Sequence, residues 1–164
     1  MRPLSGTQEM KELLLNELEL IVRTSSNLIE KISPNHLDFR PRENMRSLHE
    51  LVLHLVSVPS TDLLILQEYT EEDIRELEAG ITKEHDPEQW TGFMKEGLLE
   101  VRRYMESLDE DDFLHKETKA FYLDHGTAQA KWLIEIVTHA QHHRAQLFNY
   151  MKEQGYDINM FDLY

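Results

Sequence analysis

The sequence predicts an all-α protein, a four-helix bundle with a long loop before its last helix. Apolar residues recur at spacings of three, four and seven along four long segments, which is the pattern of amphipathic helices. Only six Gly and five Pro occur among 164 residues, too few for a disordered or loop-rich chain. A chain of this length can enclose one core, so we expect residues 1–164 to form a single domain.

The first predicted helix extends from about Gln8 to Ile32. Its apolar stripe consists of Leu14, Leu18, Ile21, Leu28 and Ile32. Pro34 follows closely and ends the helix, because proline disfavours helical backbone in the residue before it. The stretch DFRPREN, residues 38–44, is then expected to be a connector.

The second predicted helix begins near Met45 or Ser47 and carries the stretch SLHELVLHLVSVPSTDLLILQEY. Its apolar residues cover much of the helix circumference, so we expect burial on more than one side. They include Leu48, Leu51, Val52, Leu53, Leu55 and Val56. Pro59 lies inside this pattern and should kink the helix or divide it. The acidic stretch EEDIRELEAG then predicts a short surface helix or capped turn that ends at Gly80.

The third predicted helix begins at Asp86-Pro87 and ends near Leu108. Asp is a favoured N-cap, and Pro is a favoured first helical residue. The acidic stretch that follows is predicted to be a long loop, with a brief extended piece in KAFYL, residues 119–123.

The fourth predicted helix extends from about Thr127 to Gln154. Gly155 comes next, in the position just past a helix end where glycine is preferred. Four long helices in this order predict a bundle, and bundles commonly build metal and ligand sites from side chains on facing helices.

The charge and composition exclude several classes of function. Thirty-one acidic residues against seventeen basic ones give a formal charge of -14, which would repel a nucleic acid backbone. The chain has no Cys, so a thiol nucleophile of its own is excluded and a metal must be bound by His, Asp or Glu. No apolar run approaches the roughly 18 residues that span a bilayer, and the N-terminus lacks the features of a signal peptide. We therefore expect a cytoplasmic protein without membrane or nucleic acid partners.

Three histidines lie within five positions of the stretch THAQHHRAQ near the C-terminus. At about 100° per residue, His143 falls inside the apolar stripe of the fourth helix and His139 falls at its edge. His142 falls toward the polar flank. His139 and His143 therefore point inward, at the i, i+4 spacing that lets two imidazoles reach one ion. Such a pair is by itself a weak signal, because surface or hydrogen-bonded core histidines give the same pattern.

His54 strengthens the prediction of a metal site, because it lies in the apolar stretch ELVLHLVS of the second helix. A buried imidazole is unfavourable unless its nitrogens find partners. Together, His54, His139 and His143 would supply three nitrogen ligands from facing helices. Three protein ligands with one open position are typical of catalytic zinc sites, although imidazole also suits nickel, copper and iron.

Other polar residues have weaker claims to a role. Glu50 precedes His54 by one turn, and Glu135 precedes His139 by one turn. Either carboxylate would then orient a ligand imidazole by accepting its hydrogen bond, or would simply be an exposed charge. Asp124 would either overhang a pocket at the end of the bundle or cap the fourth helix. His49 is expected to face solvent. No Gly-x-Ser-x-Gly turn, phosphate-binding glycine loop or paired Glu-x-x-His motif is present.

Two stretches of the sequence resemble the DinB/YfiT-like family of bacterial metal-binding four-helix bundles. The first, SLHELVLHLVS, is similar to the Leu-x-x-His stretch of the family. The second, HAQHHRAQL followed by MKEQGYD, is similar to its His-x-x-His-His-Arg-Gly-Gln motif and the glycine after it. The resemblance implies that His54, His139 and His143 bind the metal. The departure is Ala145, where the family usually has Gly.

The resemblance also implies an activity. Characterised members join low-molecular-weight thiols such as bacillithiol to electrophiles, or isomerise maleylpyruvate with mycothiol, and many are homodimers. We therefore expect a metal-dependent thiol S-transferase, with zinc as the first choice of metal and nickel as another. Leu53, on the outer side of the second helix, would suit a subunit contact. One alternative is a non-catalytic metal-binding or stress-related bundle, and a fourth metal ligand from the protein, Glu50 or Asp124, would favour it. The other alternative is an interaction module whose histidines are purely structural.

Overall fold

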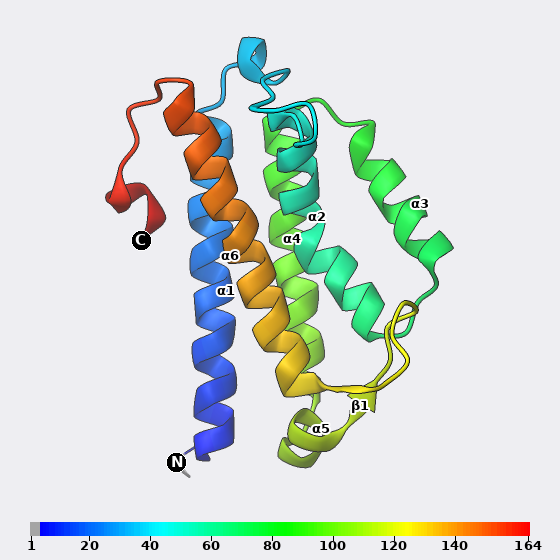
Figure 1. Ribbon diagram of the computed structural model, residues 1–164. Coiled ribbons are helices and arrows are strands. Elements are labelled where there is room, and N and C mark those ends of the chain that lie inside the picture. Colours follow the sequence, from blue (N-terminus) through cyan, green and yellow to red (C-terminus); the bar gives the residue numbers. More distant parts are fainter. Residues whose placement is uncertain (1–3) are drawn as a thin grey trace.

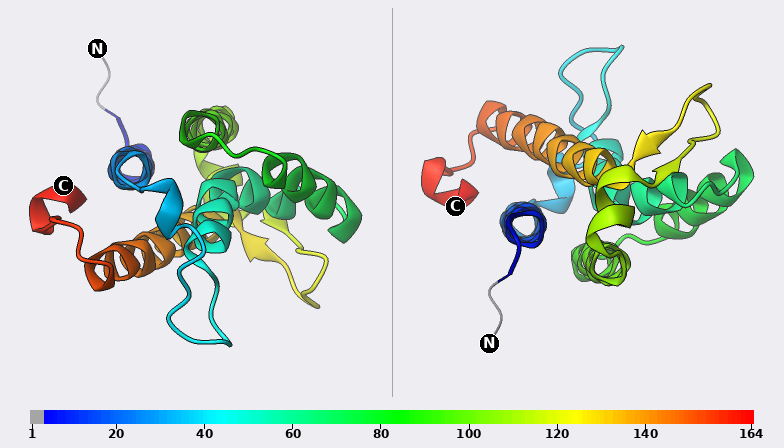
Figure 2. Two further views of the ribbon diagram at one scale, coloured as in Figure 1. Left: turned by 90° about the horizontal axis from the view of Figure 1, so that it is seen from above. Right: turned by 90° about the horizontal axis from the view of Figure 1, so that it is seen from below.

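The computed structural model describes residues 4–164, and its four long helices form the predicted all-α bundle (Figure 1). These helices are α1 (Gly6–Glu30), α2 (Leu48–Leu66), α4 (Pro87–Ser107) and α6 (Gln129–Glu153). Each packs against two of the others: α2 against α4 and α6, and α1 against α4 and α6. The end-on views show this four-cornered arrangement (Figure 2). Its buried apolar side chains form one contiguous core.

The third helix, α3 (Glu71–Thr82), lies outside the bundle and packs on α2 (Figures 1 and 2). It returns the chain to the end of the molecule where α2 began, so α2 and α4 run in the same direction. Such long crossover connections are one of the known ways to build a four-helix bundle. The prediction that this segment ends at Gly80 is wrong, because Ile81 is buried and holds the last turn against the core.

Pro59 lies inside α2 and does not divide it. The helix is continuous from Leu48 to Leu66, and Figure 1 shows it changing direction in its lower part. A proline in a helix interior removes one backbone hydrogen bond and crowds the preceding turn, so a bend is the expected result. The start of α2 is also well defined, because Ser47 and Glu50 form a reciprocal capping box.

The stretch between α4 and α6 is more structured than a loop. It contains the short helix α5 (Glu110–His115) and the strand β1 (Glu117–Thr118), which pairs antiparallel with β2 (Thr127–Ala128). The extended piece therefore precedes the KAFYL stretch in which it was predicted, and α6 begins two residues later than expected. The buried Gln129 side chain explains this, because its amide donates to Lys116 O and Thr118 Oγ1 across the hairpin.

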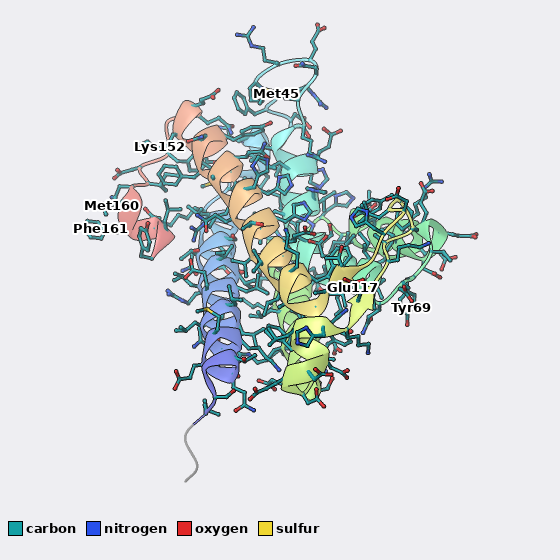
Figure 3. The ribbon with its side chains drawn as sticks, turned by 60° about the horizontal axis from the view of Figure 1, so that its bottom comes forward. Met45, Tyr69, Glu117, Lys152, Met160 and Phe161 are labelled. Carbon is teal, nitrogen blue, oxygen red and sulfur yellow. The ribbon has the colours of Figure 1, made fainter. Side chains whose placement is uncertain are left out.

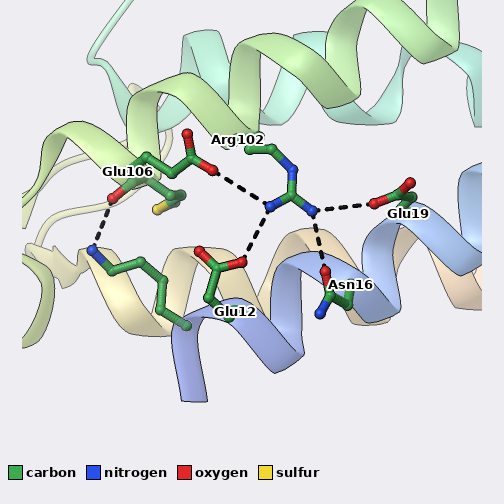
Figure 4. Close-up of polar contacts among 7 residues, drawn as sticks. Glu12, Asn16, Glu19, Arg102 and Glu106 are labelled. Atoms are coloured by element: carbon green, nitrogen blue, oxygen red, sulfur yellow. Dashed lines mark hydrogen bonds and ion pairs between the residues drawn. The ribbon is translucent and has the colours of Figure 1, made fainter. Parts of the chain in front are cut away.

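Polar contacts fix α1 against α4 (Figure 4). The Arg102 guanidinium on α4 pairs with Glu12 and Glu19 on α1, at 3.3 and 3.2 Å. Beside it, the buried Lys11 ammonium donates to Met105 O and Leu108 O at 2.9 and 2.8 Å. The lysine thereby caps the C-terminal end of α4, where Leu108 N also donates to Met105 O.

Among residues 4–164, α2 is the one helix that is long and apolar enough, by length and composition, to cross a membrane. His, Glu and Asp interrupt its apolar run, so a membrane-spanning length was not predicted from the sequence. Eleven of the nineteen residues of α2 are buried inside the protein, where they pack against α4, α6 and α3. The apolar character of α2 is therefore explained by its position in the bundle.

We predict that two glycines of α4 respond oppositely to substitution by alanine. A Cβ at Gly97 would lie 2.5 Å from Ser60 Oγ and 3.1 Å from Pro59 Cβ, whereas a Cβ at Gly92 meets nothing within 4 Å. Gly97→Ala should lower the free energy of unfolding by about 1–3 kcal/mol through overpacking. Gly92→Ala should raise it by about 0.5–1 kcal/mol through helix propensity. Urea denaturation measures both values, and a Gly97→Ala variant as stable as Gly92→Ala would contradict the close packing of α2 on α4.

Candidate metal centre

The structure brings together three histidines that are far apart in the sequence. His54 comes from the middle of α2, and His139 and His143 come from the facing side of α6. One ring nitrogen of each can be chosen so that all three lie within 4.8 Å of one another. The ring centroid of His54 is 5.4 Å from that of His139 and 4.3 Å from that of His143. We call these three residues the triad.

The burial of the α6 histidines follows the helical phase predicted from the sequence. His143 is buried, His139 is half-buried and His142 is exposed. His142 still lies beside the triad, with its ring centroid 4.9 Å from that of His143. It is therefore a flanking group at the surface, while the other two histidines face α2.

Two polar side chains fix the orientation of the α6 imidazoles. Asp62 Oδ2 lies 2.8 Å from Nδ1 of His139, and Gln146 Oε1 lies 2.8 Å from Nδ1 of His143. When Nδ1 donates its proton to such an oxygen, the lone pair of the neutral ring is on Nε2. Each ring can then present Nε2 to a ligand, the arrangement that metal-binding histidines commonly adopt.

The electrostatics of the triad favour neutral imidazoles on two of its members. Burial, assisted by the neighbouring histidines and Arg46, lowers the pKa of His54 from 6.5 to about 3. Burial also lowers the pKa of His143 to about 4, although its hydrogen bond to Gln146 works in the opposite direction. The hydrogen bond to Asp62 raises the pKa of His139. Burial raises the pKa of Asp62 itself, and the hydrogen bond with His139 opposes that effect.

Two cavities adjoin the triad, and a third reaches Gln146, the partner of His143. We call residues 117–128, which run from β1 to β2, the hairpin stretch. The hairpin cavity, about 540 Å³, adjoins His54 and His139 and lies between α2, α3, α6 and the hairpin stretch. Much of its wall is apolar or aromatic: Ile65, Ile74, Tyr122 and Trp132. The α3 cavity, about 270 Å³, adjoins His54 beneath α3. The loop cavity, about 670 Å³, reaches Gln146 and is bounded by the loop before α2, on which Met45 is labelled in Figure 3.

The hairpin stretch is held in place beside α2. The backbone N–H of Lys119 donates to Glu68 Oε1 at 2.8 Å, which ties this stretch to the turn between α2 and α3. Tyr69 and Glu117 mark the two segments in Figure 3. Tyr122, further along the hairpin stretch, is thereby placed over the hairpin cavity, where it remains more than half exposed.

Comparison with known proteins identifies the family. A sequence model of the DinB family matches residues 7–164. The chain belongs to the DinB family. The crystal structure assigned to this family from Exiguobacterium sibiricum 255-15 matches with a TM-score of 0.81 and 25% identity, over 99% of this chain and 100% of that one. A DinB-like protein of Bacillus subtilis shares the fold, with a TM-score of 0.65, 22% identity and coverage of 89% and 94%. A search of curated proteins found no match.

The three-histidine group of this DinB-family chain could hold a metal ion. Its donor set fits such a role, because three imidazole nitrogens converge and two of them are oriented by second hydrogen bonds. Ala145, the departure from the family motif, is exposed on α6 and does not face the triad helix α2. The assignment of the three histidines as ligands stays a prediction.

Of the two roles considered for Glu50 and Glu135, the structure shows surface charges and not partners of the histidines. Glu50 accepts from Ser47 N at 2.7 Å and pairs with Arg40, while Glu135 pairs with Lys131. Asp62, which the sequence did not single out, makes the contact with His139. A signal existed: a carboxylate eight residues after His54 lies about two turns along the same helix, so it can reach the same side.

Three further expectations concern residues that lie away from the triad. Asp124 pairs with the adjacent His125, and both are exposed. His49 does not face solvent: its ring packs against that of Trp90 on α4, with centroids 5.3 Å apart. Leu53 is half-buried and lines the α3 cavity, so only part of its side chain is open to a subunit contact. The homodimer stays a prediction.

The lowered pKa of His54 predicts how the stability of the metal-free protein depends on pH. Between the unfolded value of 6.5 and the folded value of about 3, the unfolded chain binds more protons at His54 than the folded one does. The free energy of unfolding should therefore fall as the pH drops from 6.5 toward 4. Urea denaturation with chelator present should show a smaller fall for His54→Gln than for the wild type. Equal falls in the two proteins would contradict a buried, neutral His54, and His125→Gln is the exposed control.

Proposed function

We propose that this protein is a metal-dependent S-transferase that joins a low-molecular-weight thiol of the cytoplasm to an electrophile. The observation that carries the proposal is a convergent three-nitrogen group with no carboxylate of residues 4–164 completing it. Three protein ligands and an open position are the pattern of catalytic rather than structural zinc sites. The family membership and the adjoining cavities support the same conclusion.

His54, His139 and His143 would hold the divalent ion, with zinc the first choice and nickel the alternative. A bound divalent ion lowers the pKa of a thiol or water at its open position, so that the nucleophilic anion exists near neutral pH. The residues of the chain hold and orient the metal ligands. Asp62 and Gln146 hold the His139 and His143 rings in one tautomer and one orientation.

The hairpin cavity is where we place the electrophile. It adjoins His54 and His139, and its volume of about 540 Å³ falls in the range of small-molecule sites. Ile65 and Trp132 would contact the apolar part of the molecule and exclude water from the reacting atoms. Tyr122, at the exposed edge, would cover it from the hairpin side.

The alternative is a metal-binding or stress-related bundle without catalysis. It would need a fourth protein ligand to close the coordination. The two carboxylates considered for that position are engaged elsewhere, Glu50 with Arg40 and Asp124 with His125. Their positions therefore favour the enzyme, and an activity assay decides between the two.

We predict that metal-loaded protein consumes a thiol in the presence of a generic electrophile and that metal-stripped protein does not. The assay uses a panel of cytosolic thiols and tag-free protein, with metal content measured on the same samples. His54→Ala and His143→Ala should lose both metal and activity, because each removes one nitrogen of the triad.

His142→Ala is the matched control, since His142 is exposed beside the triad and should keep its metal. Metal bound in the wild type with no rate difference for any thiol would reject the transferase and leave the non-catalytic bundle. Full metal content in both triad variants would reject the metal site itself.

We further predict that Asp62→Asn weakens metal binding by about 10–100-fold, the usual effect of removing a carboxylate behind a ligating histidine. The carboxylate accepts from His139 Nδ1 and thereby favours the tautomer that presents Nε2. Competition with a chromophoric chelator measures the affinity. Glu135→Gln is the control, because Glu135 lines the same cavity and pairs with Lys131 instead of a triad histidine. Equal affinities for Asp62→Asn and the control would show that the Asp62 carboxylate does not strengthen metal binding through His139.

A further inference from the structure

Arg46 lies in the loop just before α2. It lines both the loop cavity and the α3 cavity. His54 forms part of the α3 cavity wall, and Gln146, the partner of His143, forms part of the loop cavity wall. The backbone of Arg46 is fixed, because Tyr150 Oη on α6 donates to its carbonyl oxygen at 3.0 Å. A ligand that reaches His54 through the α3 cavity therefore occupies a cavity that Arg46 also lines.

The charge of Arg46 is not compensated by an ion pair with any of residues 4–164. The neighbouring Arg40 differs, because it pairs with Glu50 at 3.0 Å. Glu50 is further occupied by the Ser47 N–H in the α2 capping box. Of the two arginines, Arg46 is therefore the one that is free to bind the anionic group of a ligand.

The positive charge of Arg46 also reaches the triad. It lowers the pKa of His54, His139 and His143, in each case as a smaller effect than the first cause. An electrostatic influence on all three rings is consistent with the position of the guanidinium between the two cavities. Charges of this kind act over a few ångströms when solvent is partly excluded.

We propose that Arg46 binds a carboxylate of the thiol cosubstrate while its sulfur is directed to the triad. The proposal rests on the proposed function and narrows its substrate class to thiols that carry a carboxylate. Arginine suits this role because its planar guanidinium can donate two parallel hydrogen bonds to a carboxylate. The apolar hairpin cavity, which also adjoins His54, is then left for the electrophile, so each reactant has a cavity of its own next to this histidine.

The remaining charges of the protein make a local cation necessary for such a ligand. The chain carries a formal charge of -14, and the long-range field of such a protein repels anions. Glu43 lines the loop cavity and Glu78 lines the α3 cavity, so each adds a negative charge on one side. Only a carboxylate in direct contact with Arg46 overcomes these repulsions, and Glu78→Gln should therefore strengthen its binding.

The test compares thiols that differ only in charge. Calorimetry measures the affinity of 3-mercaptopropionate against 3-mercapto-1-propanol, and of 6-mercaptohexanoate against 6-mercapto-1-hexanol, for cobalt-loaded and metal-free protein. Wild-type protein should prefer the carboxylate of at least one pair by about tenfold, the range of a charge-assisted hydrogen bond. The preference should shrink as salt is added.

Arg46→Gln should abolish the preference, while Arg40→Gln, which removes a guanidinium already paired with Glu50, should keep it. Absence of a preference in both forms of the wild type would overturn the proposal, as would a preference that survives in Arg46→Gln. Failure of the proposed function is seen separately: the carboxylate preference would persist while the thiol-consumption assay shows no dependence on metal.

Discussion

The packing of α2 against α6 is the contact on which the candidate site depends. His54 belongs to one helix and His139 and His143 belong to the other, so the three nitrogens converge only when the facing sides of these helices are in register. Apolar residues on both helices, including Leu51, Leu55 and Leu147, are fully buried around this contact. Their packing in turn places the imidazoles in surroundings that keep two of them neutral. The core thereby determines both the geometry and the protonation of the site.

Helical periodicity was sufficient to predict which side chains of a single helix point into the site. It separated the inward His139 and His143 from the exposed His142, because the direction of a side chain on a regular helix is set by its position alone. It also gave the four bundle helices with ends close to those observed. The apolar surroundings of His54 added this residue to the predicted site, and the resemblance to the family motif implied the same three histidines.

The features that were missed are those that depend on contacts between distant segments. Asp62 and His139 are 77 positions apart, and nothing local to either residue indicates that they meet. The same is true of the hairpin, which is fixed by Gln129 reaching back to Lys116 and Thr118. Gly80 was interpreted as a helix end, but the burial of Ile81 against the bundle outweighs the modest cost of one glycine in a helix.

The bend of α2 at Pro59 connects the fold to the hairpin cavity. Before the bend, α2 contributes His54 to the triad. After it, the helix leans away from α4 toward α3, and the other α2 residues that line the cavity, Thr61, Asp62 and Ile65, all follow the proline. A straight helix would continue along the bundle core, whereas the bent one separates from its neighbours and leaves space that α3 and the hairpin stretch enclose. Gly97 allows α4 to approach α2 closely at this bend. The glycine therefore provides a tight core contact on one side of α2, and the bend at the proline provides an open cavity on the other.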